Sequence, residues 1–322
     1  MRAMVISRFG GPDVFEERDV PTPTAGPGQL LVRVVASGTN PVDAKLRQDG
    51  SWAGLIPPVV LGYDVSGVVE AVGPGVTGFA RGDEVFYTPE IFDNPSGSYA
   101  EFNAVSAAIV ARKPRNLTHE QAAAVPLAGG TAWEAVIRRL QLTVGETILI
   151  HGGAGGVGSF AVQIAKAAGA HVLATAGTEN QKTLRRLGAD VAINYQRVDA
   201  TEAVLRETGG VGVDAVFDTT GSQVIPTIPA VRRGGRIATI LGFSGDMSAF
   251  YPRNLTLHGV FLLRERRRLE ELTRLIERDH LQPLVESVLP LAQVADAHRR
   301  LDSGHGRGKV VLSISSTPTA GG

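Results

Sequence analysis

The pattern of apolar runs and polar breaks changes character near residue 120. Before that point, short apolar runs alternate with turns dense in glycine and proline, such as PTPTAGPG and GPGVTG. Closely spaced short strands with turn signals between them predict a compact β-barrel. The runs that we predict as strands are Met4–Ile6, Gln29–Ala36, Val65–Val72, Asp83–Tyr87 and Tyr99–Val105.

From Thr118 onward, apolar strands alternate with helical segments. The stretch HEQAAAVPLAGGTAWEAVIRRL is helix-prone, and Gly129-Gly130 is its expected interruption. Regular alternation of this kind predicts a parallel sheet covered on both faces, a doubly wound α/β domain whose ligand crevice lies at the carboxyl ends of the strands. The predicted strands are 147–150, 171–176, 191–194, 213–218, 236–241 and 255–263, and the predicted helices begin at Ser159 and span 180–187, 200–207 and 223–231.

The last part of the chain begins with a charged helix, RERRRLEELTRLIERDH. Its leucines and isoleucine fall on one stripe, which is typical of a solvated amphipathic helix rather than of a basic binding patch. A strand at 284–289, a helix at 291–301 and a strand at 309–314 follow, and we expect the end, SSTPTAGG, to be frayed.

A glycine cluster connects the strand at 147–150 to the alanine-rich helix after it. Gly153-x-Gly155-x-x-Gly158 has the spacing of a dinucleotide-binding turn. Glycine allows the tight turn, the close approach of a pyrophosphate and close packing of strand on helix, while the free N–H groups of the helix start face the anion. A glycine-rich turn without a ligand is the alternative, but the position between a buried strand and an apolar helix favours a nucleotide site.

The end of the next strand bears on which dinucleotide binds. A site for NAD usually places an acidic residue about 20 residues past the glycines, against the ribose 2′-hydroxyl. Here Gly177 and Thr178 stand at that point, and Lys182 follows with Arg185-Arg186. A 2′-phosphate suits this basic-flanked end. Glu179 counts against that choice, and Lys182 could be a solvated helix residue, but we predict NADPH over NADH.

Composition excludes several classes of function. The 322 residues contain 32 basic and 32 acidic side chains, which gives no electrostatic case for nucleic acid or an anionic membrane. The absence of cysteine excludes disulfides, thiol catalysis and cysteine-ligated zinc. The seven histidines are scattered, so we predict no metal site. Without a secretory signal or an apolar run of about 18 residues, we expect a cytoplasmic protein.

Two turns of the first part carry polar residues that a plain turn does not require. One is Gly38-Thr39-Asn40-Pro41-Val42-Asp43, which leads into a short helical stretch, and the other runs from Leu61 to Gly67. Asn, Pro and Asp are common turn formers, so each turn taken by itself is equally consistent with a structural role.

Many motifs follow one another along the chain: GTNPVDAKLRQ, LGYDVSGVVEAVG, FARGDEVF, GSYAEF, AAVPLAGGTAWEA, ILIHGGAGGVGSFAVQIAKAAGA, TAGTENQK, LGADVAINY, GGRIATIL, LAQVADAH and GKVVLSI. Together and in this order they resemble the medium-chain dehydrogenase/reductase superfamily, in its zinc-free quinone oxidoreductase (zeta-crystallin-like) branch. Zinc alcohol dehydrogenases have a Cys where this chain has Thr39-Asn40, and Gly-His-Glu where it has Gly62-Tyr63-Asp64, so the resemblance implies a metal-independent reductase.

The resemblance implies a GroES-like substrate domain over 1–120, a Rossmann NADPH-binding domain over 121–263, and a C-terminal return, 264–322, that completes the first domain. It also implies residues around the cofactor: Gly155, Gly156 and Val157 at the pyrophosphate; Gly177, Lys182 and Tyr195 at the adenosine phosphate; Ser222 after the fourth strand; Leu241, Gly242, Phe261, Leu262 and Thr131 at the nicotinamide; and Trp52 as an aromatic near the cofactor. Thr178, at the strand end beside Gly177, is a further predicted cofactor residue.

The implied reaction is hydride transfer from NADPH to a quinone. Hydride addition leaves an oxyanion that needs a nearby donor, for which Asn40 and Tyr63 are candidates, with Asp43 in the same polar turn. Solvent is an open alternative as the source of the proton. An alkenal or enone double-bond reductase of the same fold is the nearest alternative, and a non-enzymatic NADPH-binding sensor is a third. The resemblance further implies a homodimer, for which the apolar run 255–263 could supply an edge strand.

Overall fold

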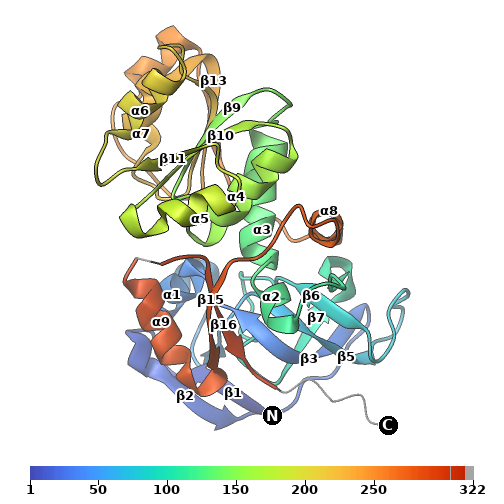
Figure 1. Ribbon diagram of the computed structural model, residues 1–322. Coiled ribbons are helices and arrows are strands. Elements are labelled where there is room, and N and C mark those ends of the chain that lie inside the picture. Colours follow the sequence, from blue (N-terminus) through green and yellow to red (C-terminus); the bar gives the residue numbers. More distant parts are fainter. Residues whose placement is uncertain (305, 316–322) are drawn as a thin grey trace. The chain divides into compact units, whose positions relative to one another are not determined.

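The computed structural model describes residues 1–304 and 306–315, and the chain divides into two compact units. The first unit contains Met1–Ala128, Leu263–Arg278 and the chain from Pro283 onward, and the second contains Gly129–Leu262 and Asp279–Gln282. Both are visible in Figure 1. Apart from Ser315, the expected frayed end SSTPTAGG lies outside the described residues.

A seven-stranded sheet forms most of the first unit. Its last strand in sequence, β16 (Lys309–Ser313), pairs antiparallel with β3 (Gln29–Gly38), so the red end of the chain lies beside its blue beginning in Figure 1. The order is β15 (Val285–Pro290), β16, β3, β5 (Val65–Val72), β6 (Glu84–Tyr87) and β8 (Ala111–Arg112), with β7 (Phe102–Ser106) also paired to β3.

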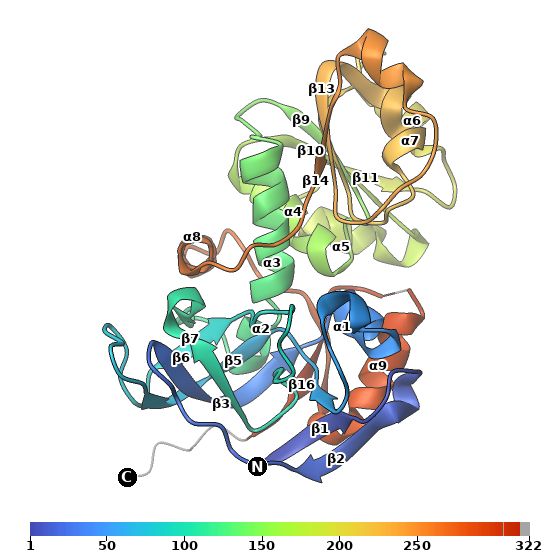
Figure 2. The ribbon, with the colours of Figure 1, turned by 180° about the vertical axis from the view of Figure 1, so that it is seen from behind.

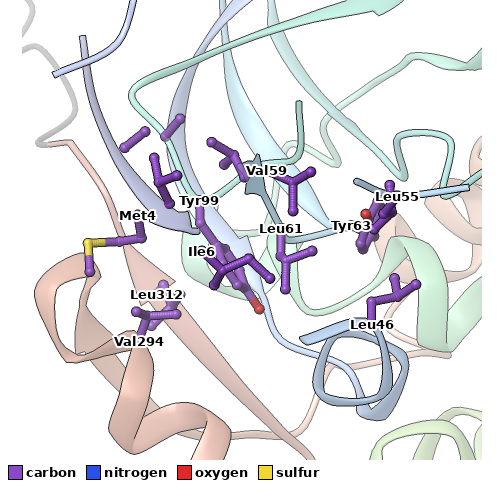
Figure 3. Close-up of a cluster of buried hydrophobic side chains, with 14 of the residues drawn as sticks. Met4, Ile6, Leu46, Leu55, Val59, Leu61, Tyr63, Tyr99, Val294 and Leu312 are labelled. Carbon is purple, nitrogen blue, oxygen red and sulfur yellow. The ribbon is translucent and has the colours of Figure 1, made fainter. Parts of the chain in front are cut away.

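A smaller sheet and several helices complete this unit. The sheet has the order β2 (Phe15–Asp19), β1 (Arg2–Ile6), β4 (Val59–Val60). Figure 3 shows the apolar cluster beneath it, in which Ile6 and Leu61 lie with Val294 and Leu312 from the end of the chain. The helices are α1 (Pro41–Gln48), α2 (His119–Ala123) and α9 (Val294–Asp302), and a fourth, α8 (Arg266–Glu277), buries Leu269, Leu272 and Ile276 as its stripe predicts.

The second unit is built on a six-stranded parallel sheet. Its order is β11 (Val191–Asn194), β10 (His171–Ala176), β9 (Thr147–His151), β12 (Val213–Asp218), β13 (Val231–Thr239), β14 (Thr256–Gly259). Figures 1 and 2 show α4 (Gly156–Ala167) and α5 (Gln181–Arg186) on one side of the sheet, with α6 (Ala200–Glu207) and α7 (Val224–Thr227) on the other. The predicted doubly wound α/β sheet is confirmed, and its strand order reverses between β9 and β12.

The expected interruption at Gly129-Gly130 is wrong. The helix α3 (Pro126–Trp133) runs through both glycines and continues as a π-helix, Glu134–Arg139. Both glycines are buried, and tertiary packing outweighs a helix-propensity cost of about 1 kcal/mol per glycine. The break instead precedes Pro126, whose ring is tolerated only at the start of a helix.

Other predicted elements also have different bounds. The helix expected to begin at Ser159 begins at Gly156, and the strand expected over 236–241 begins earlier, at Val231, and ends at Thr239. The helix expected over 223–231 consists of α7 and a 3₁₀ turn, Ile228–Ala230, because Pro229 has no N–H to continue the helical hydrogen bonds. The strand expected over 255–263 shortens to β14, and the one expected from Tyr99 begins at Phe102.

The core of the second unit offers a matched test of these assignments. Val216 in β12 is fully buried, whereas Val144, in the turn before β9, is 83% exposed. We expect Val216→Ala to lower the free energy of unfolding by roughly 1–3 kcal/mol through lost burial and cavity formation. Val144→Ala, the same chemical change, should alter it by less than about 0.5 kcal/mol in urea denaturation. Equal effects would contradict the assignment of β12 to the core.

Candidate functional site

The glycine turn at the end of β9 is built by backbone contacts too close for any other residue. The N–H of Gly155 donates to the carbonyl of Gly152 at 3.0 Å, and Gly152 has a φ of +70°. A Cβ added at Gly158 would lie 2.1 Å from the oxygen of Gly152. Only glycine therefore fits at 158, and helix α4 starts directly against the end of the strand.

The start of α4 has the properties of an anion site. Gly155 is its N-cap, no acidic side chain occupies its first turn, and the first N–H groups of a helix have no acceptor within the helix. These N–H groups and the helix dipole attract negative charge. The predicted pyrophosphate residues Gly155, Gly156 and Val157 lie here, so this part of the structure fits a dinucleotide.

The predicted adenosine-phosphate residues gather at the ends of β10 and β11. Gln196 binds the N–H and Oγ1 of Thr178 at 3.0 and 2.9 Å, and Asn194 donates to the same Oγ1 at 2.9 Å. Lys182 is exposed on α5 and forms no ion pair within the described part of the chain. Tyr195 is 55% exposed beside this corner. A cation next to small polar strand ends suits a 2′-phosphate.

A carboxylate that the sequence reasoning missed organises the loop after β12. Asp218 is fully buried and accepts the N–H and hydroxyl of Thr220, at 2.8 and 2.7 Å, and the N–H of Gln223, at 2.9 Å. It thereby fixes the loop that carries Ser222. The sequence feature that could have identified Asp218 is an Asp at the end of an apolar strand, followed by Thr and Gly. At such a position a carboxylate can accept the N–H groups of the loop.

Two predicted cofactor residues line a hollow between the loops that follow β12 and β13. Ser222 and Gly242 are among its lining residues, and Leu241 packs against Gly221. The volume of the hollow is about 620 Å³, and it is lined by Gly221, Ser222, Val224, Ile225, Pro226, Gly242, Phe243 and Ser244.

The remaining predicted cofactor residues lie elsewhere. In the second unit, Thr131 is buried on α3, and Phe261 and Leu262 follow β14. Trp52 belongs to the first unit, where its half-exposed ring meets the ring of Phe92 edge to face at 6.1 Å. Their contacts with a cofactor stay predictions.

The predicted polar turn of the first unit is part of a buried charged cluster. Asn40 caps α1, and its Nδ2 donates to Oδ2 of Asp64 at 2.9 Å. The ammonium of Lys309 donates to Asn40 Oδ1, to the carbonyl of Thr39 at 2.7 Å and to Asp64 Oδ2 at 3.2 Å. All of these side chains are at most 4% exposed. Both polar atoms of the Asn40 side chain are therefore engaged within the protein.

Asp43 and Tyr63 each retain an unsatisfied polar atom. Oδ2 of Asp43 accepts the N–H of Asn40 at 2.8 Å and the hydroxyl of Tyr99 at 2.9 Å, but Oδ1 is buried with no partner among the described residues. Burial raises the pKa of Asp43 to about 7. The Tyr63 hydroxyl is also buried and lacks a partner within that part of the chain, and burial, with Asp43 nearby, raises its pKa. Of the two predicted oxyanion donors, Tyr63 is the uncommitted one.

Within residues 1–304 and 306–315, no three His, Cys, Asp or Glu side chains converge on a point where a metal could bind. Across the same ranges, no helix combines the length and the apolarity that crossing a bilayer requires.

The close contact at Gly158 provides a test of the nucleotide site. We expect Gly158→Ala to weaken dinucleotide binding more than tenfold, because the added methyl group displaces the turn from the start of α4. Gly259→Ala is the control in the same unit, since an added Cβ there meets nothing within 4 Å. Calorimetric titration with NADPH would measure both, and an unchanged dissociation constant in Gly158→Ala would refute this account of the turn.

Comparison with known proteins gives the same architecture. Residues 26–115 match the model of the alcohol dehydrogenase GroES-like domain, and residues 187–312 match that of a zinc-binding dehydrogenase domain. A solved NAD-dependent alcohol dehydrogenase superposes with a TM-score of 0.92 at 38% identity, covering 98% of this chain and 100% of that one. The quinone oxidoreductase of Coxiella burnetii gives a TM-score of 0.89 at 32% identity, covering 98% and 99%.

Curated relatives span almost the whole chain. The NADPH-dependent alkenal/one oxidoreductase of Arabidopsis thaliana is 36% identical over 97% of this chain and 79% of its own length. The human quinone oxidoreductase is 33% identical over 98% of both chains. These matches confirm the GroES-like and Rossmann-like domains predicted from the sequence. The chain therefore belongs to the medium-chain dehydrogenase/reductase superfamily, and it is an oxidoreductase of the kind that binds a nicotinamide dinucleotide.

Proposed function

We propose that this protein is an NADPH-dependent, metal-independent quinone reductase. The observation that carries the proposal is the position of Lys309. Its ammonium binds Asn40 and Asp64, which stand in the two segments where zinc alcohol dehydrogenases carry their metal ligands. A fixed positive charge disfavours a second cation there. Asn and Tyr are also poor replacements for the Cys and His that zinc prefers.

The residues of the second unit support a dinucleotide with a 2′-phosphate. Gly155, Gly156 and Val157 would hold the pyrophosphate at the start of α4, and Lys182 would pair with the 2′-phosphate. Glu179 is exposed near the same corner and is the residue against this choice. When bound, NADPH supplies the hydride, and the protein supplies orientation and exclusion of water.

In the first unit, the Tyr63 hydroxyl is the proposed donor to the oxygen that becomes negative when the acceptor receives the hydride. It is buried and uncommitted, whereas Asn40 already binds Asp64 and Lys309. A donor held ready in a water-poor site stabilises a developing oxyanion more than the same donor in water. Asn40 then serves to hold the turn beneath the acceptor.

Reduction of an enone or alkenal is the second candidate. Two relatives favour it by name: the alkenal/one oxidoreductase of Arabidopsis thaliana, and the 2-methylene-furan-3-one reductase of Solanum lycopersicum, which is 34% identical over 97% of this chain. Quinones and enones are both conjugated carbonyl compounds that yield an oxyanion after hydride addition. The Tyr63 hydroxyl could therefore serve as the donor for either class of acceptor.

We also propose a homodimer that pairs the edge strand β14. This strand ends the six-stranded sheet and is only four residues long, so pairing would involve fewer residues than the apolar run 255–263 first suggested. Exposed Phe261 and Leu263 follow it and would add apolar area. A monomeric mass in light scattering would remove this proposal.

The deciding experiment follows oxidation of NADPH and NADH with a naphthoquinone, a benzoquinone and a simple enone. We expect faster NADPH loss with the quinones. Activity with the enone alone would assign the protein to the double-bond reductases. Tight NADPH binding without oxidation by any acceptor would instead favour the non-enzymatic sensor.

Lys182 should determine the preference for NADPH over NADH. We expect Lys182→Ala to raise KM for NADPH about tenfold, the typical value of one charge-assisted phosphate contact, and to leave KM for NADH unchanged. Arg206→Ala, which removes an exposed positive charge from α6 in the same unit, is the control. Equal effects on both coenzymes would place Lys182 away from the 2′-phosphate.

A further inference from the structure

A chain of buried hydrogen bonds crosses the first unit beneath the polar turn, and the proposed function does not use it. It joins Asp43 to Tyr99, whose hydroxyl lies 2.9 Å from Asp43 Oδ2 and 3.2 Å from His298 Nε2. Nδ1 of His298 lies 3.2 Å from Arg47 Nη1. All four side chains are at most 1% exposed. Figure 3 shows Tyr99 within the surrounding apolar cluster.

The direction of these hydrogen bonds follows from Arg47, the residue at the end of the series opposite Asp43. A guanidinium only donates, so His298 must accept at Nδ1 and carry its hydrogen on Nε2. That hydrogen is donated to the Tyr99 oxygen, and Tyr99 must then donate to Asp43 Oδ2. Burial, with Arg47 beside it, lowers the pKa of His298 to about 3, which agrees with a neutral ring. Arg47 is itself fixed by the Gly10 carbonyl at 3.0 Å and by Asp302 at 2.8 Å.

The groups around Asp43 do not balance a negative charge on it. Oδ2 has two donors, and Oδ1 has none within the described ranges. Lys309, on β16, lowers the pKa of Asp43, but its ammonium hydrogen bonds go to Thr39, Asn40 and Asp64. Asp64 raises the pKa of Asp43. The charge of Asp43 also raises the pKa of Tyr63, but no hydrogen bond joins the two among the described residues. A buried carboxylate with a bare oxygen is costly, which favours the neutral acid.

We propose that Asp43 is held as a carboxylic acid with its proton on Oδ1, and that it is the proton store for the reduction. Arg47, His298 and Tyr99 are positioning residues, because they direct the Tyr99 hydrogen to Oδ2 and leave only Oδ1 for the proton. The role in reduction rests on the proposed function. When NADPH supplies the hydride, its electron pair would go to the acceptor carbon and the new oxyanion would take the proton of Asp43. Solvent would then supply a new proton to the Asp43 carboxylate left behind.

Infrared spectroscopy of the full-length protein tests the protonation state without any acceptor. We expect the carbonyl band of a protonated carboxylic acid that fades as the pH rises through about 7 and is absent in Asp43→Asn. A band that persists in Asp43→Asn belongs to another carboxyl, such as Asp64, and would overturn the proposal. The absence of any such band in the wild-type protein would do the same.

Tyr99→Phe tests the positioning chain. Since the Tyr99 hydroxyl stabilises the charged form of Asp43, its removal should move the titration upward by roughly half to one pH unit. Tyr87→Phe is the matched control, because Tyr87 is also fully buried and donates a hydrogen bond at 2.9 Å. Its acceptor is Asn103, which does not belong to the series of hydrogen bonds from Arg47 to Asp43. The same titration in both variants would refute the role of Tyr99.

The pH dependence of stability supplies a second readout should Tyr99→Phe fold poorly. The pKa of Asp43 is higher in the folded protein than in the unfolded chain, so its contribution to stability is complete below about pH 4 and is lost as the pH rises through about 7. Asp43→Asn should flatten the fall in Tm between these values, and an unchanged pH profile would count against the proposal. If the infrared band behaves as expected but no acceptor is reduced, the proposed function fails and the assignment of the Asp43 proton stands.

Discussion

The first unit depends on one buried charge pair, Lys309 with Asp64. The ammonium comes from the last strand, β16, and the carboxylate from the segment before β5, so the pair joins the end of the chain to its first hundred residues. Asp64 also accepts the N–H of Leu127 at 2.7 Å, and Lys309 donates to the carbonyl of Thr39. A charge buried this deeply is tolerated only when its partners are all in place. The polar turn at Asn40 is therefore fixed in part by Lys309, a residue 269 positions away in the sequence.

The same constraint explains which polar groups remain available for chemistry. Lys309 and Asp64 engage both polar atoms of the Asn40 side chain. These bonds fix the shape of the turn, but they leave the Asn40 amide unavailable as a donor to a substrate. Tyr63 and one oxygen of Asp43 are left buried and unsatisfied among the described residues. Buried polar atoms without partners are costly, and their persistence beside each other is consistent with a site that meets a substrate.

In the second unit, contacts within the parallel sheet fix the loops of the candidate dinucleotide site, just as the charge pair fixes the polar turn of the first unit. The N–H of Gly153 binds the carbonyl of Thr175 on the neighbouring strand, and the carbonyl of Gly152 is in contact with Gly158. The buried carboxylate of Asp218 fixes the next loop. His151 lies beside Asp218 in the sheet, and burial lowers the pKa of His151 to about 4, so its ring is neutral near neutral pH. The loops at the strand ends are therefore held by contacts within the sheet.

The sequence by itself determined the alternation of strands and helices, the glycine turn and the absence of cysteine ligands, because each depends on local spacing or residue type. It also indicated the polar residues of the first unit as a group. Tertiary structure alone decided that α3 runs through Gly129-Gly130, since only packing offsets the cost of glycine in a helix. It also decided that Asn40 is engaged while Tyr63 is not, and that His298 and Arg47 stand behind Asp43. The contacts that decide these points join residues up to 269 positions apart. A local pattern in the sequence cannot predict contacts over such separations.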